Sequence, residues 1–345
     1  MTHRSPGRIV AVLLVTAAAT MGFAPSAAAA APYTFAGPVF GLAAGPGDVL
    51  FAADSGAGVV RLQGGEGQLV VQLPRVTDVA PVRPGRMWAI AGRKLYKVVH
   101  GTPHFLAGLG KFERIVNPDG GEIDSNPFDV AALGSRRVLI ADAAANALLV
   151  SNLRGGVDWV ATLPEQIVST DNAKTLAGCP DAPPELADIC DLPDEIPAQA
   201  VSTSVAVGPD GAYYVTELKG FPAPLGESRI WRIEPGTRHV HCEADVADSP
   251  CTVVADGFTS IVDITFGSDG TAYVVELDEA SWFAVEVVPD AMVGGTVDTC
   301  DSTTWTCTEE ATALTIPMAV AVNESGPFVV VSALIPGETE VVPLP

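Results

Sequence analysis

One short pattern recurs six times and constrains the fold more than any other feature of this chain. Each copy has an apolar run, a turn rich in Gly, Pro, Asp or Ser, and a second apolar run that often ends in an acid. The copies are VAVGPDGAYYVTE at 205–217, ITFGSDGTAYVVE at 264–276, VAALGSRRVLIAD at 130–142, LAAGPGDVLFAAD at 42–54, VAPVRPGRMWAIA at 79–91 and VAVNESGPFVVVS at 320–332. Internal repeats of this size are each one supersecondary unit.

The spacing of the copies predicts four short strands in each unit. Successive turns are 37, 51, 75, 59 and 56 residues apart. Third strands are predicted at 59–62, 94–98, 146–150, 228–233, 283–287 and 340–344, and fourth strands at 69–73, 104–106, 158–163, 251–255 and near Leu314. This pattern is typical of an all-β, six-bladed β-propeller of four-stranded blades.

The sixth copy ends at Pro345 without a fourth strand. We expect residues 33–36 to supply it, to pair with the third strand of blade six and to close the ring, since closure hides free sheet edges. We letter the strands of each blade A to D from the axis outward. The A–B turns and C–D hairpins then lie on one face, and the D–A and B–C connections on the other, the D–A/B–C face.

Residues 1–30 have the features of a secretory signal peptide. His3, Arg4 and Arg8 precede an apolar stretch at 9–21, and small residues at Ala28 and Ala30 fit cleavage after Ala30. An apolar stretch of about 13 residues is too short to span a bilayer. We expect no membrane span, an extracellular protein, and one propeller domain over residues 31–345.

The charge of the chain excludes some partners. The sequence has 41 acidic and 19 basic residues, a net charge of −22. Cleavage would remove Arg4 and Arg8 but no acid, which makes the net charge −24. Nucleic acid and anionic membranes are therefore excluded as partners. We expect a monomer whose partner is a small molecule or a protein.

Six cysteines form three close pairs along the sequence. An even count in an exported protein predicts disulfides. The pairs are Cys179/Cys190, Cys242/Cys251 and Cys300/Cys307. The last two lie in C–D hairpins. The first lies in the largest insertion, 164–201, which carries eight acidic residues against the single basic residue Lys174. We expect this insertion to form an ordered lid over the D–A/B–C face, since long loops are usually functional or disordered.

Four stretches resemble one family beyond the generic propeller pattern. They are DSNPFDVAAL at 124–133, ADAAANALLV at 141–150, VSTSVAVGPDGAYYVTELKGFPAPLGESRIWRI at 201–233 and GFTSIVDITFGSDGTAYVVEL at 257–277. Together they resemble the ScyD/ScyE family of exported NHL-type propeller proteins. Lys219, Ala223 and Ala144 depart from the Thr, aromatic residue and Gly that are usual there. The resemblance implies the fold and export, and no particular reaction.

Two sets of acidic residues recur at fixed repeat positions. Asp54, Asp142, Glu217 and Glu276 end the second strand of four blades. We expect these carboxylates to accept backbone N–H groups of the B–C connections. Asp78, Asp129 and Asp263 precede the core of three first strands, where they would approach the axis. They either cap their own D–A loops or hold a metal, for which oxygen ligands favour Ca²⁺.

No catalytic frame is evident in the sequence. It contains no G-x-S-x-G motif, and its histidines after residue 30 lie at the hairpins of blades two and four. We therefore expect a non-catalytic binding protein that holds a small molecule, a cation or a protein on its D–A/B–C face. The candidate ligand residues are Asn126, Phe128, Thr203, Phe221 and Phe258. The alternative is a Ca²⁺-assisted hydrolase or oxidoreductase of a secreted small metabolite, by analogy with other six-bladed propellers.

Overall fold

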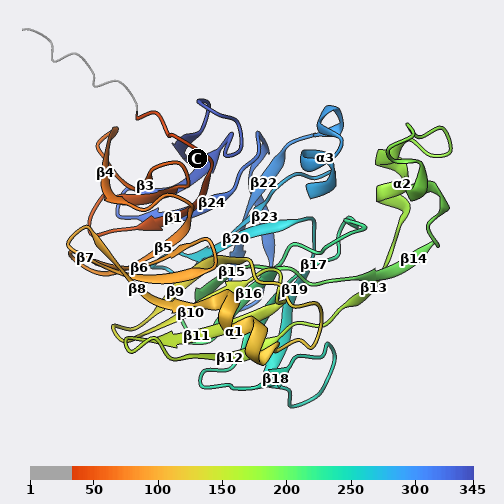
Figure 1. Cartoon of the computed structure of the whole chain (residues 1–345). Helices are drawn as coiled ribbons and strands as arrows, with labels where there is room; N and C mark the ends of the chain where they lie inside the picture. The colour runs from red at the N-terminus through yellow and green to blue at the C-terminus, as the bar shows by residue number, and fades with distance from the viewer. Residues whose placement is uncertain (1–32) are drawn as a thin grey trace, which may run out of the picture. The chain divides into compact units, whose positions relative to one another are not determined.

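The computed structural model describes residues 33–345, so the predicted signal peptide at 1–30 lies outside the described residues. Six antiparallel sheets are arranged in a ring, which confirms the predicted six-bladed β-propeller (Figure 1). In this part of the chain no helix has both the length and the apolar character needed to cross a membrane.

The first three blades follow the predicted repeat. Blade one contains β1 (Val39–Ala44), β2 (Leu50–Asp54), β3 (Gly58–Gln63) and β4 (Glu66–Gln72). Blade two contains β5 (Val76–Arg83), β6 (Arg86–Ala91), β7 (Lys94–Val99) and β8 (Thr102–Gly108). Helix α1 (Leu109–Val116) connects it to blade three, which contains β9 (Pro127–Leu133), β10 (Arg137–Asp142), β11 (Ala147–Asn152) and β12 (Val157–Thr162).

The last three blades complete the ring. Blade four contains β15 (Ser202–Val207), β16 (Tyr213–Glu217), β17 (Ser228–Ile233) and β19 (Cys251–Phe258), and its β18 (Val240–His241) extends the sheet of blade three. Blade five contains β20 (Ile261–Phe266), β21 (Thr271–Glu276), β22 (Gly295–Asp301) and β23 (Cys307–Leu314). Blade six contains β24 (Ala319–Asn323), β25 (Gly326–Val331) and β26 (Glu340–Pro343).

Each inner strand packs against the inner strand of the next blade, and β24 packs against β1 to close the ring. The inner strands therefore surround the axis. Most second strands are largely buried between neighbouring blades; all five residues of β16 are buried, for example, whereas β25 of blade six is only partly buried. Burial on both faces explains their continuous apolar runs.

The predicted third strand of blade five is wrong. Residues 282–286 form helix α3 (Trp282–Glu286), followed by the short 3₁₀ helix η2 (Pro289–Ala291). Asp278 holds this long B–C connection, because its carboxylate accepts the backbone N–H of Ala280 at 2.8 Å and of Gly294 at 2.9 Å. The true third strand is β22, whose mixed polar sequence GTVDTCD conceals its strand character.

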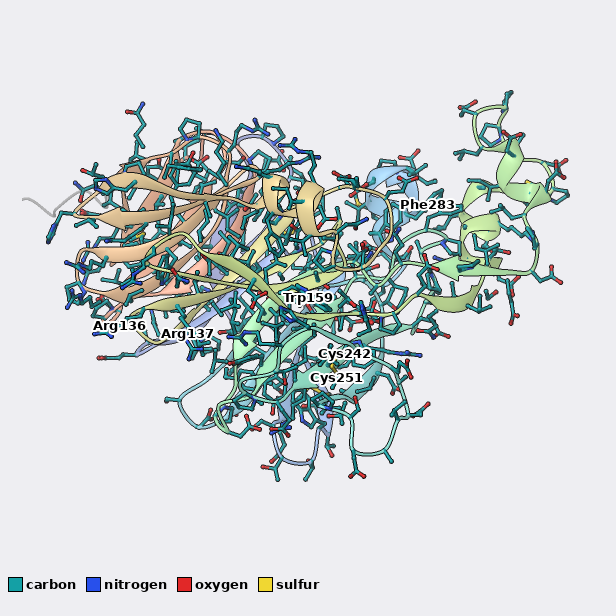
Figure 2. The ribbon with its side chains drawn as sticks, turned by 60° about the horizontal axis from the view of Figure 1, so that its bottom comes forward. Arg136, Arg137, Trp159, Cys242, Cys251 and Phe283 are labelled. Atoms are coloured by element: carbon teal, nitrogen blue, oxygen red, sulfur yellow. A yellow bond between two sulfur atoms is a disulfide. The ribbon has the colours of Figure 1, made fainter. Side chains whose placement is uncertain are left out.

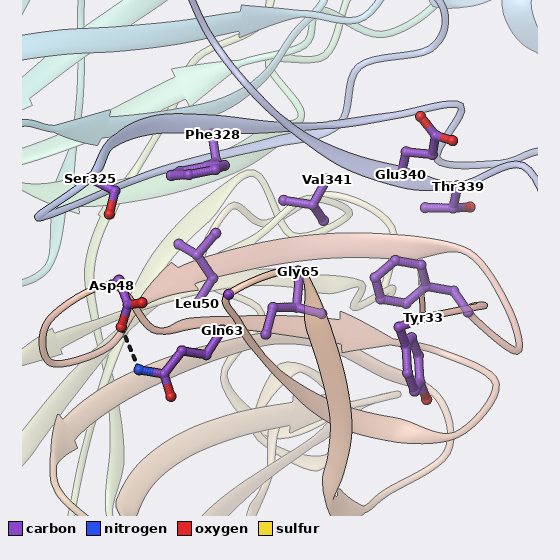
Figure 3. Close-up of a pocket in the computed structure, with 13 residues that line it drawn as sticks. Tyr33, Asp48, Leu50, Gln63, Gly65, Ser325, Phe328, Thr339, Glu340 and Val341 are labelled. Atoms are coloured by element: carbon purple, nitrogen blue, oxygen red, sulfur yellow. Dashed lines mark hydrogen bonds between the residues drawn. The ribbon is translucent and has the colours of Figure 1, made fainter. Parts of the chain in front are cut away.

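The predicted pairing of residues 33–36 with blade six is also not formed. Within residues 33–345, the sheet of blade six has three strands. The N-terminal segment packs through its side chains instead: Phe35 is 8% exposed and contacts the Tyr33 ring edge-on at 5.2 Å. The Ala36 N–H donates to the buried Asp54 carboxylate at 2.8 Å. Figure 3 shows the cavity of about 480 Å³ that this arrangement leaves between blades one and six.

All three predicted disulfides are formed. Figure 2 shows Cys242–Cys251 in blade four, and Cys300–Cys307 joins β22 to β23. Such bridges indicate an oxidising, extracellular environment. The Cys179–Cys190 bridge lies in the insertion, which we name the arm. It contains β13 (Gln166–Ser169), α2 (Asp171–Ala177), the 3₁₀ helix η1 (Ala187–Asp191) and β14 (Glu195–Ala198).

The arm is ordered, as expected, but it does not extend across the D–A/B–C face as the predicted lid would. Figures 1 and 2 both show it projecting beyond the ring, beside α3. Asn172 of α2 holds it there: its Nδ2 donates to the carbonyl of Ala223 at 2.7 Å and lies 3.0 Å from the hydroxyl of Ser281. The arm is therefore fixed to blades four and five at the edge of the D–A/B–C face.

Candidate ligand-binding site

The predicted axial aspartates form a belt that ties neighbouring blades together. A side chain at the same position of blades two to five accepts the backbone N–H of the next blade's inner strand. The four bonds are Val130 N to Asp78 at 3.0 Å, Val205 N to Asp129 at 2.6 Å, Ile264 N to the Ser204 hydroxyl at 3.2 Å, and Val320 N to Asp263 at 2.7 Å. Asp129 and Asp263 also accept the N–H of the residue that follows them, Val130 at 2.6 Å and Ile264 at 2.8 Å. The predicted alternatives, a local cap or a metal ligand, therefore omitted the bond that each Asp makes to the neighbouring blade.

The belt also links its own members. The Ser204 hydroxyl lies 2.6 Å from Asp129 and 2.8 Å from Asp263. Burial, followed by the charge of Asp129, raises the pKa of Asp78 well above its usual value. Burial, again followed by the charge of Asp129, raises the pKa of Asp263 to about 7. The belt aspartates thus carry fewer negative charges at neutral pH than their number implies.

A cavity of about 300 Å³ follows the axis and is lined by all three aspartates. Their carboxylates are engaged with backbone amides, and within residues 33–345 no three His, Cys, Asp or Glu residues are arranged to hold a metal ion. The belt provides hydrogen-bond acceptors for inner-strand N–H groups that face the axis, which would otherwise have no partner in the neighbouring blade.

The acids at the ends of the second strands are structural, but the predicted bonds to the B–C connections are formed only in part. Asp54 accepts the N–H of Gly56 at 2.9 Å, in its own B–C connection. Asp142 accepts the N–H of Asn126 at 2.7 Å, and Glu276 accepts that of Thr259. These last two bonds reach back to the D–A connection before the same blade. Of the two acids, Asp142 also accepts an N–H of its own B–C connection, that of Ala145 at 3.4 Å.

Glu217 differs from the other members of this set because it forms a buried ion pair. Its partner is Lys219, which is 1% exposed, while Glu217 is fully buried. Trp231 Nε1 donates to the second oxygen of Glu217 at 2.6 Å. Burial is the main cause of two opposite shifts: it raises the pKa of Glu217 and lowers that of Lys219. The pair is therefore part of the core of blade four and not accessible to a ligand.

The five predicted ligand residues do not converge on one pocket. Phe128 lines the axial cavity beside Phe40, and Asn126 is exposed on the loop before β9. Thr203 is buried and donates to the Ile261 carbonyl at 2.8 Å. Phe221 is half-exposed against Phe283. Phe258 alone lies in a cleft between blades four and five, which extends from Glu279 in the B–C connection of blade five to Trp305 in its C–D hairpin.

This cleft lies between β19 of blade four and the sheet of blade five, and measures about 470 Å³. Phe258 and Trp305 contribute aromatic walls. The described residues that line the cleft include no lysine, arginine or histidine. Its acidic residues are Asp256, Glu276, Glu279, Asp298 and Glu309.

Strand register brings the acids of blade five together. Asp298 on β22 is directly opposite Glu309 on β23, and Glu276 is opposite Thr296. The Thr296 hydroxyl lies 2.8 Å from Glu279 and 3.2 Å from Glu276. A face that packs against the neighbouring blade would ordinarily be apolar, so this concentration of carboxylates requires a compensating partner.

Asp298 is the most conspicuous of these residues. Its side chain is 6% exposed, and its Oδ2 atom is buried with no hydrogen-bond donor. Burial is the main cause that raises the pKa of Glu276 to about 9, and contact with Asp298 adds to it. Burial also raises the pKa of Asp298. Without a ligand, the two carboxyl groups therefore share a proton at neutral pH. Sequence reasoning missed this pair because it misplaced the third strand of blade five.

Comparison with known proteins identifies the class of this protein. No protein-family model and no curated protein sequence matches it. It is similar to solved six-bladed β-propellers. One is a Bacteroides thetaiotaomicron protein of unknown function (TM-score 0.55, 12% identity, 90% of this chain and 70% of that one).

Two others are named as enzymes. The first belongs to carbohydrate-active enzyme family AA12 of Trichoderma reesei (TM-score 0.54, 11% identity, 90% of this chain and 94% of that one). The second is a gluconolactonase from Xanthomonas campestris (TM-score 0.53, 13% identity, 91% of this chain and 88% of that one). At these identities the similarity shows the fold alone.

Proposed function

We propose that this protein is a secreted, non-catalytic propeller of the ScyD/ScyE type that binds a small organic cation on its D–A/B–C face. The ligand lies in the acidic cleft between blades four and five. A cavity of about 470 Å³ is in the range that accommodates small organic molecules. The predicted signal peptide and the three disulfides support secretion.

The observation that carries this proposal is the buried Oδ2 atom of Asp298, which no N–H group or hydroxyl group of the described residues reaches. In the absence of a ligand, the only donor available to this carboxylate is the proton that it shares with Glu276. A buried carboxylate oxygen without a donor is strongly disfavoured unless a positive charge compensates it. An ammonium group supplies both N–H donors and charge. The aromatic side chains of Phe258 and Trp305 add favourable contacts for the carbon atoms around the cation.

Proton linkage follows from the same geometry. A cation next to Glu276 and Asp298 favours their ionised forms, so binding must displace the shared proton. The pKa of Glu276, about 9 in the free protein, falls when the ligand binds. Affinity for a cation of constant charge should therefore rise between pH 6 and pH 9.

The test is isothermal titration of the mature chain with choline, cadaverine and spermidine at constant ionic strength. We expect one-to-one binding of at least one of them, and Asp298→Asn should weaken it at least tenfold. The matched control is Asp188→Asn, which removes the same charge from an exposed position on the arm and should leave the affinity unchanged. Choline keeps its charge at all pH values and serves for the pH series.

Three results would refute the proposal. One is that none of the three amines binds. Another is that Asp298→Asn and Asp188→Asn weaken binding equally, which would indicate non-specific attraction to an acidic protein. The third is an affinity for choline that falls with rising pH.

The metal-assisted enzyme remains the second hypothesis, with Asp78, Asp129 and Asp263 as its ligands. Each of these carboxylates already accepts a backbone N–H of the next blade, which favours the structural role. Turnover of a lactone or sugar by the purified protein, lost on chelation and restored by Ca²⁺, would favour the enzyme instead.

A further inference from the structure

Glu113, near the end of α1, is the most anomalous buried charge in the described chain. Its side chain is 2% exposed, and neither carboxylate oxygen has a hydrogen-bond donor. The amide Oδ1 of Asn117, which caps the C-terminal end of α1, is also buried without a donor. The backbone N–H of Asn117 donates to the Glu113 carbonyl at 2.8 Å, so both residues lie at the C-terminal end of α1.

The surroundings make an uncompensated carboxylate still less favourable. Burial, followed by the charges of Asp119, Asp142 and Asp124, raises the pKa of Glu113 to about 7. Arg93 is paired with Asp124 at 2.6 Å, on an exposed part of this loop. The C-terminal end of a helix adds partial negative charge from its carbonyl groups. Apart from Arg93, which is paired with Asp124, the charges and the helix dipole named here favour a cation.

Asp119 is held in the same loop. Its Oδ1 accepts the N–H of Gly121 at 3.0 Å, and its Oδ2 lies 3.1 Å from Nδ2 of Asn146, in the B–C connection of blade three. The Asn146 side chain in turn accepts the N–H of Val201 at 2.9 Å. The loop after α1 is thus anchored to blade three through Asp119, while the oxygens of Glu113 and Asn117 remain without partners.

We propose that Glu113, Asn117 and Asp119 form a calcium site that fastens α1 and the loop at 117–126 to blade three. The donor set is carboxylate and amide oxygen, which Ca²⁺ prefers and softer metals do not. One cation supplies the missing partner for three buried oxygen atoms at once. The site lies in the connection between blades two and three, so it is independent of the cleft between blades four and five.

The test is thermal unfolding and calorimetric titration of the mature chain with CaCl₂ after treatment with a chelator. We expect one Ca²⁺ per chain at this site and a rise of about 4 °C in Tm at a Ca²⁺ concentration one hundred times the Kd. Glu113→Gln should abolish this response. It should also raise the Tm of the calcium-free protein, because it removes a buried, unpartnered charge.

The matched control is Glu122→Gln, which removes the same charge from an exposed position in the same loop and should keep the full response. Asp298→Asn should also keep it, which separates this site from the amine cleft. No Ca²⁺ response in the wild type would overturn the proposal, as would an undiminished response in Glu113→Gln. Loss of the response in Asp298→Asn alone would place the cation in the cleft and would equally overturn it.

Discussion

Removal of residues before Gly37 should destabilise the propeller, although these residues form no strand. The truncation deletes Phe35, whose ring is 8% exposed in the core between blades one and six. Loss of a buried phenylalanine side chain costs about 3 kcal/mol. It also deletes the Ala36 N–H, which leaves the fully buried Asp54 with one fewer donor, at a further cost of about 1–2 kcal/mol.

The sum, about 4–5 kcal/mol, is a large part of the 5–15 kcal/mol by which proteins are typically stable. Urea unfolding of chains that begin at Ala31 and at Gly37 measures it directly. Phe35→Ala should account for most of the loss, and Thr34→Ala, at the exposed position between the two aromatic residues, should be nearly silent. Equal midpoints for the two chains would show that the segment does not contribute to the core as its burial implies.

Three further predictions concern the belt, the acids and the disulfides. Gly41→Ala should destabilise the fold by about 1–3 kcal/mol in urea unfolding, because a Cβ there would lie 2.0 Å from Asp78 Oδ1; an unchanged midpoint would contradict this. The raised pKa values of Asp263, about 7, and Glu276, about 9, mean that the folded state holds protons which the unfolded chain releases above pH 4. Stability should therefore fall from pH 6 to pH 9, and less so in Asp263→Asn; a Tm that rises over this range would refute the sign. Reduction of the disulfides, which close loops of only 7 to 11 residues, should leave the far-UV circular dichroism of the strands intact, and its loss would show that the bridges maintain the fold.

The sequence predicts this fold well where a turn separates two apolar runs. The first two strands of all six blades lie where the repeats place them, because Gly-containing turns and buried runs are local signals. Prediction of secondary structure from the sequence fails where contacts with distant residues determine the conformation of a segment. Residues 282–286 have apolar character but form α3, since Asp278 closes the connection around them.

The site was less predictable than the fold for the same reason. The role of Asp129 depends on Val205, which lies in the next blade, so its position in the repeat alone could not distinguish a cap, a metal ligand or an interblade tie. Asp298 and Glu113 look like ordinary surface acids in the sequence. Only their burial without donors distinguishes them, and burial depends on segments that are distant in the chain.

The belt of hydrogen bonds around the axis is interrupted at blade one, and this has a consequence for how the ring can be assembled and opened. Blades one and six have Gly41 and Ala319 at the belt position, and neither side chain can accept an amide N–H. The four belt hydrogen bonds join each of blades two to five to the blade that follows it in the sequence, and therefore to the blade that is synthesised next. Blade one is made first, and no belt bond joins it to a neighbour. Its hydrogen bonds to blade six lie outside the belt: the Val39 N–H donates to the Ala333 carbonyl at 3.3 Å, and Asn323 Nδ2 donates to the Asp48 carbonyl at 2.9 Å. We therefore expect the ring to close last, and to open first on heating or under force, at the boundaries of blade one.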